Sequence, residues 1–225
     1  MKERNPNVEF LRVIMMLLII MLHLSGELFD IKNIIHQSHS LLVSSIFVIR
    51  SFCFLGVSTF AFISGYYGIL TSTGKKLIRF EFFALTWGLI FIILDFLFNG
   101  FSSVNNLILF LMPTTSGICW YFSSYMLLLI FAPYISFGFE HFDLKINRSI
   151  VVVVVLLCYG GSFLFHQNGT SFMLLLYIYI IGRYLRLYPI AKWENNSGSI
   201  AYFSIAINAL LAFMISYFNI GKGFC

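Results

Sequence analysis

Seven apolar segments, each close to the length of a membrane-spanning helix, constrain the fold of this chain more than any other feature. They cover residues 8–28, 46–70, 80–98, 118–138, 149–165, 171–188 and 199–218. About 17–25 predominantly apolar residues are needed to cross the hydrocarbon core of a bilayer as an α-helix. Because that core holds no water, each crossing segment must satisfy its backbone hydrogen bonds internally, as a helix does. The sequence therefore predicts an all-α, polytopic transmembrane helix bundle, with residues 1–225 forming one domain.

The charged residues agree with this class and set an orientation. Of the 225 residues 60% are hydrophobic and 10% are charged, whereas a soluble domain averages about 25% charged residues. With the N-terminus in the cytoplasm, 11 of the 14 Lys and Arg residues fall inside, and only Lys32, Arg50 and Lys222 fall outside. Positively charged loops favour the cytoplasmic side. This asymmetry accounts for the net charge of +5 without a nucleic-acid partner.

The first apolar segment carries two polar side chains on one predicted helix face. Arg12 and His23 are 11 residues apart, which at about 100° per residue makes about three turns plus roughly 20°. Their separation along the helix axis is about 16 Å, half the thickness of a bilayer core. Polar groups at membrane depth are costly unless they face protein or a water-filled cavity. The pair therefore predicts a helix that lines a polar passage.

Each of these two residues also has a simpler interpretation. Arg12 lies near the start of the segment, where a long side chain can snorkel to the lipid headgroups. His23 can be an interfacial residue bonded to a backbone carbonyl or to solvent. Histidine is nevertheless suited to general-base catalysis, because its unperturbed pKa is close to neutral pH. We therefore take His23 as the candidate base, Arg12 as its companion, and Glu9 as a flanking residue that supports them.

The next candidate residues follow the second predicted span. That span ends with Ser64, Gly65 and Tyr66, and small residues such as the first two let neighbouring helices approach closely. Lys76 and Arg79 follow in an inner loop, where they contribute to the positive-inside signal. Alternatively, they form a docking site for the phosphates of a cytoplasmic anionic cofactor, since Lys and Arg bind phosphate through charge-assisted hydrogen bonds.

Features further along the chain indicate interfaces and loops. Trp120 and Tyr121 open the fourth predicted span, where we expect them in an aromatic belt at the outer face. The apolar stretch 107–112 is too short to cross a bilayer, so we assign it to an external loop. His36 and His39 lie in a polar outer loop without further metal ligands, so we expect no metal site.

These motifs, in this order, resemble the membrane-bound acyltransferase-3 family, whose members O-acylate sugars and cell-envelope polysaccharides. The matching elements are Glu9-Phe10-Leu11-Arg12 with His23, then Phe62-Ile63-Ser64-Gly65-Tyr66, the Lys76-x-x-Arg79 loop, and Trp120-Tyr121-Phe122. They run through about the first 140 residues, and the later spans match in hydropathy only.

The resemblance implies a function and a set of roles. It implies that His23 is catalytic, that Arg12 is essential and that the Lys76–Arg79 loop binds acyl-CoA. Lys76 stands where the family has arginine, which keeps the charge but loses bidentate phosphate geometry. On this basis we predict an O-acetyltransferase of the bacterial plasma membrane. Its partners are membrane lipid, acetyl-CoA on the cytoplasmic side and a carbohydrate acceptor such as an exopolysaccharide, and no protein partner is indicated.

Two other functions stay open at this stage. The family has about ten spans against the seven seen here, so we expect the chain to be incomplete at its C-terminal end. An inactive fragment, or a non-catalytic membrane subunit, is therefore one alternative. The other is a secondary transporter or exporter in which Arg12 and His23 line an ion pathway, although the chain shows no repeated half of the kind typical of transporters.

Overall fold

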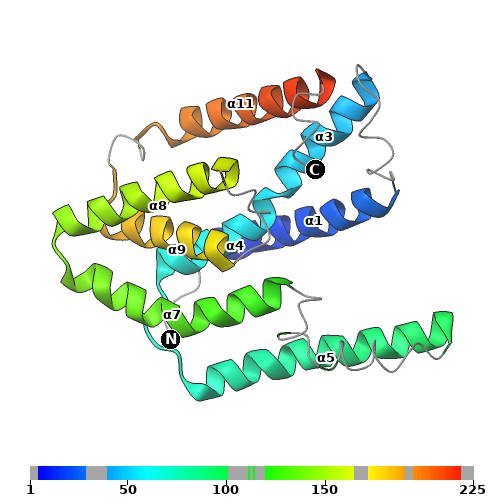
Figure 1. Ribbon diagram of the computed structural model, residues 1–225, viewed down its shortest axis with the longest axis horizontal. Helices are drawn as coiled ribbons and strands as arrows, with labels where there is room; N and C mark the ends of the chain where they lie inside the picture. The colour runs from blue at the N-terminus through cyan, green and yellow to red at the C-terminus, as the bar shows by residue number, and fades with distance from the viewer. Residues whose placement is uncertain are drawn as a thin grey trace. The chain divides into compact units, whose positions relative to one another are not determined.

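The chain is helical wherever the structure describes regular elements. The computed structural model describes residues 5–28, 40–100, 111, 114, 120–164, 172–190 and 195–218. The helices are α1 (Pro6–Leu28), α3 (Leu41–Cys53), α4 (Leu55–Tyr67), α5 (Gly74–Asn99), α7 (Trp120–His141), α8 (Leu144–Leu164), α9 (Phe172–Leu187) and α11 (Ser197–Tyr217) (Figure 1). The predicted all-α class is therefore confirmed.

Five helical stretches among the described residues are long and apolar enough to cross a membrane. They are Pro6–Gly26, Leu41–Tyr67, Gly74–Phe98, Trp120–His141 and Ser197–Tyr217. Helices α8 and α9 occupy the other two predicted spans but are not among these five. With 16 residues, α9 is about 24 Å long, which is shorter than a typical hydrocarbon core of about 30 Å. The chain is thus a multi-pass membrane protein, and the cytoplasmic location of its N-terminus stays a prediction.

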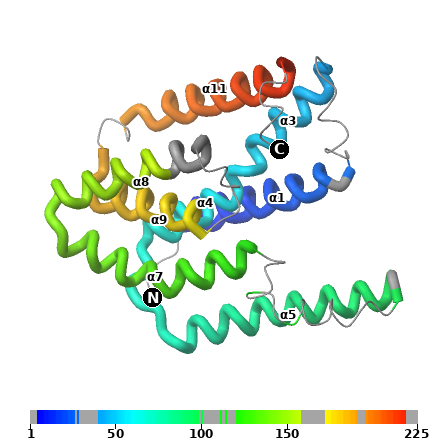
Figure 2. Tube along the Cα trace, viewed as in Figure 1, coloured from blue at the N-terminus to red at the C-terminus, as the bar shows by residue number. Residues whose placement is uncertain are grey.

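The second span begins earlier than the sequence predicts, and this changes the position of Arg50. Helix α3 starts at Leu41, where the Ser40 hydroxyl caps the helix by accepting a hydrogen bond from the Val43 amide. After a turn at Phe54, α4 continues along the same path, so that Leu41–Tyr67 forms one candidate span (Figure 2). Arg50 is nine residues from the start of this span, a depth of about 14 Å. The structure therefore places Arg50 inside the span, whereas the sequence analysis counted it with the outer residues.

The helices form two compact units, divided within α4. The first unit comprises Met1–Phe60 and Pro189–Cys225, and the second comprises Ala61–Tyr188. In the first unit α3 packs against both α1 and α11, and the Ser51 hydroxyl donates a 2.7 Å hydrogen bond to the side-chain carbonyl of Asn208. In the second unit α9 packs against both α7 and α8. One central helix thus joins two others in each unit.

Two glycines bring α4 and α9 into backbone contact in the second unit. A Cβ atom on Gly65 would overlap the backbone carbonyl of Tyr179. A Cβ atom on Gly182 would lie 2.6 Å from the carbonyl oxygen of Phe62. Helices in membranes associate closely where small residues let their backbones meet. Gly65 therefore has the packing role that its sequence context favoured.

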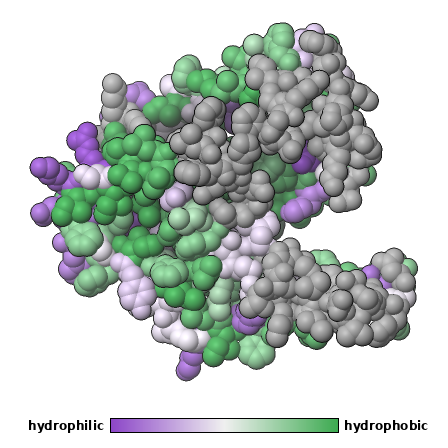
Figure 3. All heavy atoms as spheres, in the orientation of Figure 1, coloured by the Kyte–Doolittle hydropathy of each residue, from purple (hydrophilic) through white to green (hydrophobic). Residues whose placement is uncertain are grey.

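The surface of the second unit separates into apolar and polar parts. Large apolar side chains such as Phe137 and Leu156 are 63% and 66% exposed, as expected of side chains that face lipid. Hydrophilic residues gather at the turn from α7 to α8 (Figure 3), where His141, Asp143 and Lys145 are exposed. This distribution places the α7–α8 turn at a membrane surface.

We expect Gly65→Ala to destabilise the protein strongly. The added methyl group would collide with the Tyr179 backbone rather than with a movable side chain, and overpacking of this kind costs about 1–3 kcal/mol or more. Gly74→Ala is the matched control, because nothing lies within 4 Å of its added Cβ and alanine favours a helix by about 1 kcal/mol over glycine. Thermal unfolding in detergent measures both effects. Equal melting temperatures for the two variants would contradict the backbone contact.

Candidate functional site

Arg12 and His23 lie on the same helix, as the sequence predicts. Helix α1 is continuous from Pro6 to Leu28, so a spacing of 11 residues returns the two side chains to nearly the same side. The Arg12 side chain is half-buried, and His23 is exposed. Both residues fall within the candidate span Pro6–Gly26.

The guanidinium of Arg12 is engaged at the beginning of α1. Its Nη1 atom lies 2.7 Å from Oε1 of Glu9, one turn earlier in the helix. The two side chains are 38% and 41% exposed. Arg12 is therefore paired with a carboxylate one turn nearer the N-terminus, further along the helix from His23, and its charge is compensated there.

A second arginine reaches the turn of α1 that carries His23. Nη1 of Arg50 donates a hydrogen bond of 2.7 Å to the Ser25 hydroxyl and one of 3.3 Å to the Leu22 carbonyl. The Ser25 hydroxyl also donates to the Leu22 carbonyl at 2.8 Å. Sequence reasoning missed this neighbour, because Arg50 is 25 and 28 residues away from its two partners.

Lys76 and Arg79 lie in the first two turns of α5 in the second unit. Both side chains are exposed, and Nζ of Lys76 donates to the carbonyl oxygen of Thr71 at 2.7 Å and to its hydroxyl at 3.2 Å. The N-terminus of a helix carries partial positive charge and outward-facing N–H groups. Two cations added at this helix start favour the binding of an anion.

Ser64 and Tyr121, two predicted supporting residues, are connected through a residue that the sequence analysis missed. A 3.1 Å hydrogen bond joins the Ser64 and Tyr125 hydroxyls. The Tyr125 ring stacks on that of Tyr121, with centroids 5.6 Å apart, and lies 5.6 Å from the ring of Phe80. Phe80 directly follows Arg79 in the chain. The aromatic start of α7 therefore lies beside the basic end of α5, and the spacing of four residues between the two tyrosines was the available signal.

The start of α7, which carries Trp120 and Tyr121, packs along the side of α5, and the location of these two residues at the outer face stays a prediction. The ring of Phe122 packs 5.6 Å from that of Phe80, and the Thr114 hydroxyl lies 2.9 Å from both carboxylate oxygens of Glu81. Glu81 is 18 residues from the far end of α5, which is about 27 Å along the helix. Aromatic packing and this hydrogen bond hold the start of α7 against the first third of α5, instead of at its far end.

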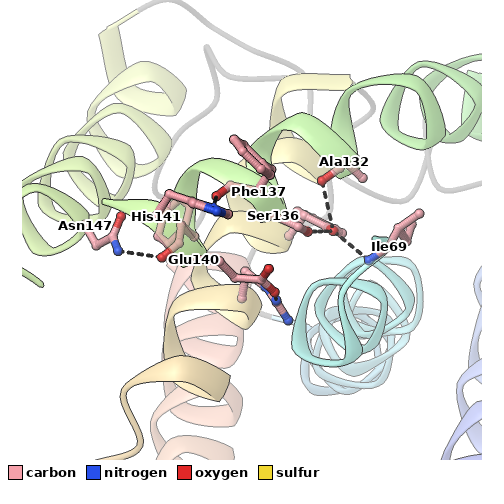
Figure 4. A network of polar contacts seen from close by, with 10 residues as sticks. Ile69, Ala132, Ser136, Phe137, Glu140, His141 and Asn147 are labelled. Atoms are coloured by element: carbon pink, nitrogen blue, oxygen red, sulfur yellow. Dashed lines mark hydrogen bonds and ion pairs between the residues drawn. The ribbon is translucent and has the colours of Figure 1, made fainter. Parts of the chain in front are cut away.

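A network of hydrogen bonds lies in the interior of the second unit, just beyond the end of α4 (Figure 4). The hydroxyl of Tyr179, a fully buried residue of α9, accepts a 2.9 Å hydrogen bond from the Ile69 amide. The same hydroxyl lies 2.7 Å from the Ser136 hydroxyl and 3.4 Å from the carbonyl oxygen of Ala132. Hydrogen bonding of this kind offsets the cost of burying polar groups away from water.

Two arginines of α9 extend this network toward the helix ends. Arg183 is 95% buried, forms an ion pair with Glu140 of α7, and lies against Gly68, whose φ of 72° suits glycine. Arg186 lies over the ring of Tyr66, with its guanidinium carbon 5.2 Å from the ring centroid. Tyr66, a predicted supporting residue, therefore holds a cation by a cation–π contact.

The same end of the second unit gathers the ends of four helices. Asn147, at the start of α8, donates to the Phe139 carbonyl of α7 at 2.8 Å and to the Tyr188 hydroxyl after α9 at 3.2 Å. Together with the contact between α4 and α9, these bonds put the ends of α4, α7 and α9 beside the start of α8. Among the described residues, basic side chains assigned to the cytoplasm, such as Lys145, Arg148 and Arg186, fall at this end, as alternating membrane crossings require.

Residues 5–28, 40–100, 120–164, 172–190 and 195–218 contain no cluster of three or more His, Cys, Asp or Glu side chains that could hold a metal ion. His36 and His39 lie outside the described residues, as does the predicted loop 107–112 except for Leu111.

Five candidate membrane spans, together with Arg12 and His23 on nearly one side of α1, define a multi-pass membrane protein with polar groups inside its first span. The model of the acyltransferase-3 family, described as an acyltransferase domain, matches residues 5–224. The chain therefore belongs to this family and is a membrane acyltransferase. Comparison with curated proteins finds no significant match, and neither does comparison with solved structures.

We expect Glu140→Gln to destabilise the protein more than Glu9→Gln does. The first change leaves the guanidinium of Arg183, with a side chain only 6% exposed, without its carboxylate. Loss of one partner of a buried pair costs about 3–5 kcal/mol, and the partial exposure of Glu140 lowers our expectation to about 1–3 kcal/mol. The exposed Glu9–Arg12 pair should contribute less than about 1 kcal/mol. The free energy of unfolding of both variants in detergent tests this order. Equal losses of stability in the two variants would refute it.

Proposed function

We propose that this acyltransferase moves an acetyl group from cytoplasmic acetyl-CoA to a hydroxyl of a cell-envelope or exopolysaccharide sugar, in the bacterial plasma membrane. The observation that carries this proposal is the placement of Arg12 and His23 on nearly one side of a continuous helix within a candidate span. In an acyltransferase, an ionisable side chain at membrane depth is a candidate functional group.

His23 acts as the general base in this proposal. It takes the proton from the sugar hydroxyl while that oxygen attacks the carbonyl carbon of the thioester. A C–O bond forms, the C–S bond breaks, and the leaving thiolate of coenzyme A takes up the proton. His23 is 17 residues from the start of α1, about 26 Å along the helix. With the N-terminus inside, this puts the base in the outer part of the span, which suits an acceptor that arrives from outside.

Lys76 and Arg79 bind the phosphates of the donor. Two exposed cations at the start of a long helix provide charge-assisted hydrogen bonds and a favourable helix end for a diphosphate. The hydroxyl and aromatic groups of Ser64, Tyr121 and Tyr125 lie next to this helix start in the same unit. They support the position of α5 against α7, and Tyr66 does the same for Arg186.

His23→Ala is expected to lower acetyl transfer by about 10²–10⁴-fold, the usual contribution of general-base catalysis. Because the side chain is exposed, the melting temperature should change little. His141→Ala, which removes an exposed imidazole at the end of α7, is the matched control and should keep full activity. Transfer of labelled acetyl groups to polysaccharide by membrane vesicles measures the effect. Full activity of a normally expressed His23→Ala protein would exclude His23 as the base.

The double change Lys76→Gln and Arg79→Gln should raise KM for acetyl-CoA about tenfold or more and leave kcat nearly unchanged. Each lost hydrogen bond to a charged group costs about 1.5–3 kcal/mol of binding, and uniform binding appears in KM. Acetyl-pantetheine, which lacks the nucleotide and its phosphates, should be used equally well by the variant and the parent protein. Lys145→Gln removes an exposed cation at the start of α8 and serves as control. An unchanged KM for acetyl-CoA would refute this donor site.

A further inference from the structure

Lys76 lies at a place where the helix dipole disfavours positive charge. It is in the first turn of α5, which also carries Lys75 and contains no acidic residue. Within the described residues, the Thr73 side chain at the N-cap of this helix makes no capping hydrogen bond. Partial positive charge at a helix start favours anions and disfavours cations. An anion bound at the start of α5 would therefore compensate both the lysines and the uncapped helix end.

The ammonium group of Lys76 is held close to this helix start. Its Nζ atom donates hydrogen bonds to the carbonyl oxygen of Thr71 at 2.7 Å and to the Thr71 hydroxyl at 3.2 Å. Thr71 precedes the first residue of α5, Gly74, by three positions, so the lysine side chain folds back toward the helix start. An ammonium group carries three N–H donors. One donor therefore remains after the two bonds to Thr71.

The residue that holds Lys76 belongs to a segment fixed to the interior of the second unit. Residues 68–73 connect α4 to α5. Within this segment the Ile69 amide donates a 2.9 Å hydrogen bond to the hydroxyl of Tyr179, which is fully buried in α9. Thr71 follows Ile69 by only two residues. The acceptors for the Lys76 ammonium are therefore anchored to α9 through a short stretch of backbone.

Anchoring of this kind matters for a lysine that binds a ligand. A lysine side chain is flexible, and ordering it costs conformational entropy when it binds. Affinity rises when a protein meets this cost before the ligand arrives. The two oxygens of Thr71 are neutral, so the bonds order the Lys76 ammonium without cancelling its charge.

We propose that Thr71 is a positioning residue of the donor site, which holds the Lys76 ammonium so that its remaining N–H group binds a phosphate of acetyl-CoA. Thr71 acts through Lys76 and makes no contact with the donor. The inference deepens the proposed function and rests on the binding of donor phosphates by Lys76 and Arg79.

The test measures KM and kcat for acetyl-CoA in membrane vesicles that contain the full chain. Thr71→Val removes the hydroxyl and keeps the shape of the side chain, so we expect KM to rise about three- to fivefold and kcat to stay unchanged. Thr71→Ser keeps the hydroxyl and should keep the parent KM. Thr86→Val is the matched control, because Thr86 is exposed on the same helix and its hydroxyl bonds to the Phe82 carbonyl. KM for acetyl-pantetheine, which lacks the nucleotide and its phosphates, should be equal in all these proteins.

A double-mutant cycle with Lys76→Gln distinguishes positioning from a general effect on the fold. If Thr71 acts through Lys76, Thr71→Val should not raise KM further once residue 76 is glutamine, because changes to two residues in contact are not additive. An equal rise of KM in both backgrounds would overturn the inference, as would an unchanged KM in Thr71→Val alone. A lower KM in Thr71→Val would also overturn it, because Thr71 would then compete with the phosphate for the ammonium group.

The double change Lys76→Gln and Arg79→Gln separates this inference from the proposed function. If it leaves KM for acetyl-CoA unchanged, the proposed donor site fails, and the role of Thr71 fails with it. If it raises KM while Thr71→Val does not, only the role of Thr71 fails.

Discussion

The backbone contact between α4 and α9 is the feature on which the second unit depends. At Gly65 and Gly182 no side chain separates the two helices, so polar groups on both reach one another directly. The Tyr179 hydroxyl can then accept from the Ile69 amide just beyond the end of α4, a donor that no helical carbonyl satisfies. The same approach lays the guanidinium of Arg183 against Gly68. A larger residue at either glycine would separate the helices, and the polar groups at their ends would lose partners that a bilayer cannot replace.

In the second unit, the polar groups that support the fold are buried, whereas the cations proposed to bind the donor are exposed. The buried polar groups of the second unit are bonded to one another, as Asn147 is to Phe139 and Tyr188, and they rigidify the end at which four helices meet. Lys76 and Arg79 are exposed instead, at the start of the helix that follows this end. Exposed cations at a helix start are accessible to an anionic ligand, as the proposed donor site requires.

The sequence predicts the helices, and it predicts that Arg12 and His23 share one side of α1. Both predictions follow from the length and the periodicity of a helix. Apolar runs of span length specify helices, and a spacing of 11 residues specifies a shared face whatever the helix packs against. The sequence does not predict contacts between helices. Arg183 and Glu140 are 43 residues apart, and Ser64 and Tyr125 are 61 apart, and no local pattern connects them. The position of α7 along α5 was missed for the same reason, since it depends on ring packing between Phe80 and Phe122.

The two polar ends of α1 differ in what they require from the rest of the first unit. Glu9 and Arg12 are three residues apart on one helix, so their pair can form as soon as the helix does. Arg50 reaches His23's turn only if α3 and α4 pack closely on α1, and Gly56 permits that approach, because a Cβ there would lie 2.9 Å from the Met15 carbonyl oxygen. The hydrogen bonds from Arg50 to Ser25 and Leu22 therefore exist only in the assembled unit. Helix periodicity within α1 predicts the first pair, whereas the second set of contacts depends on how the helices pack.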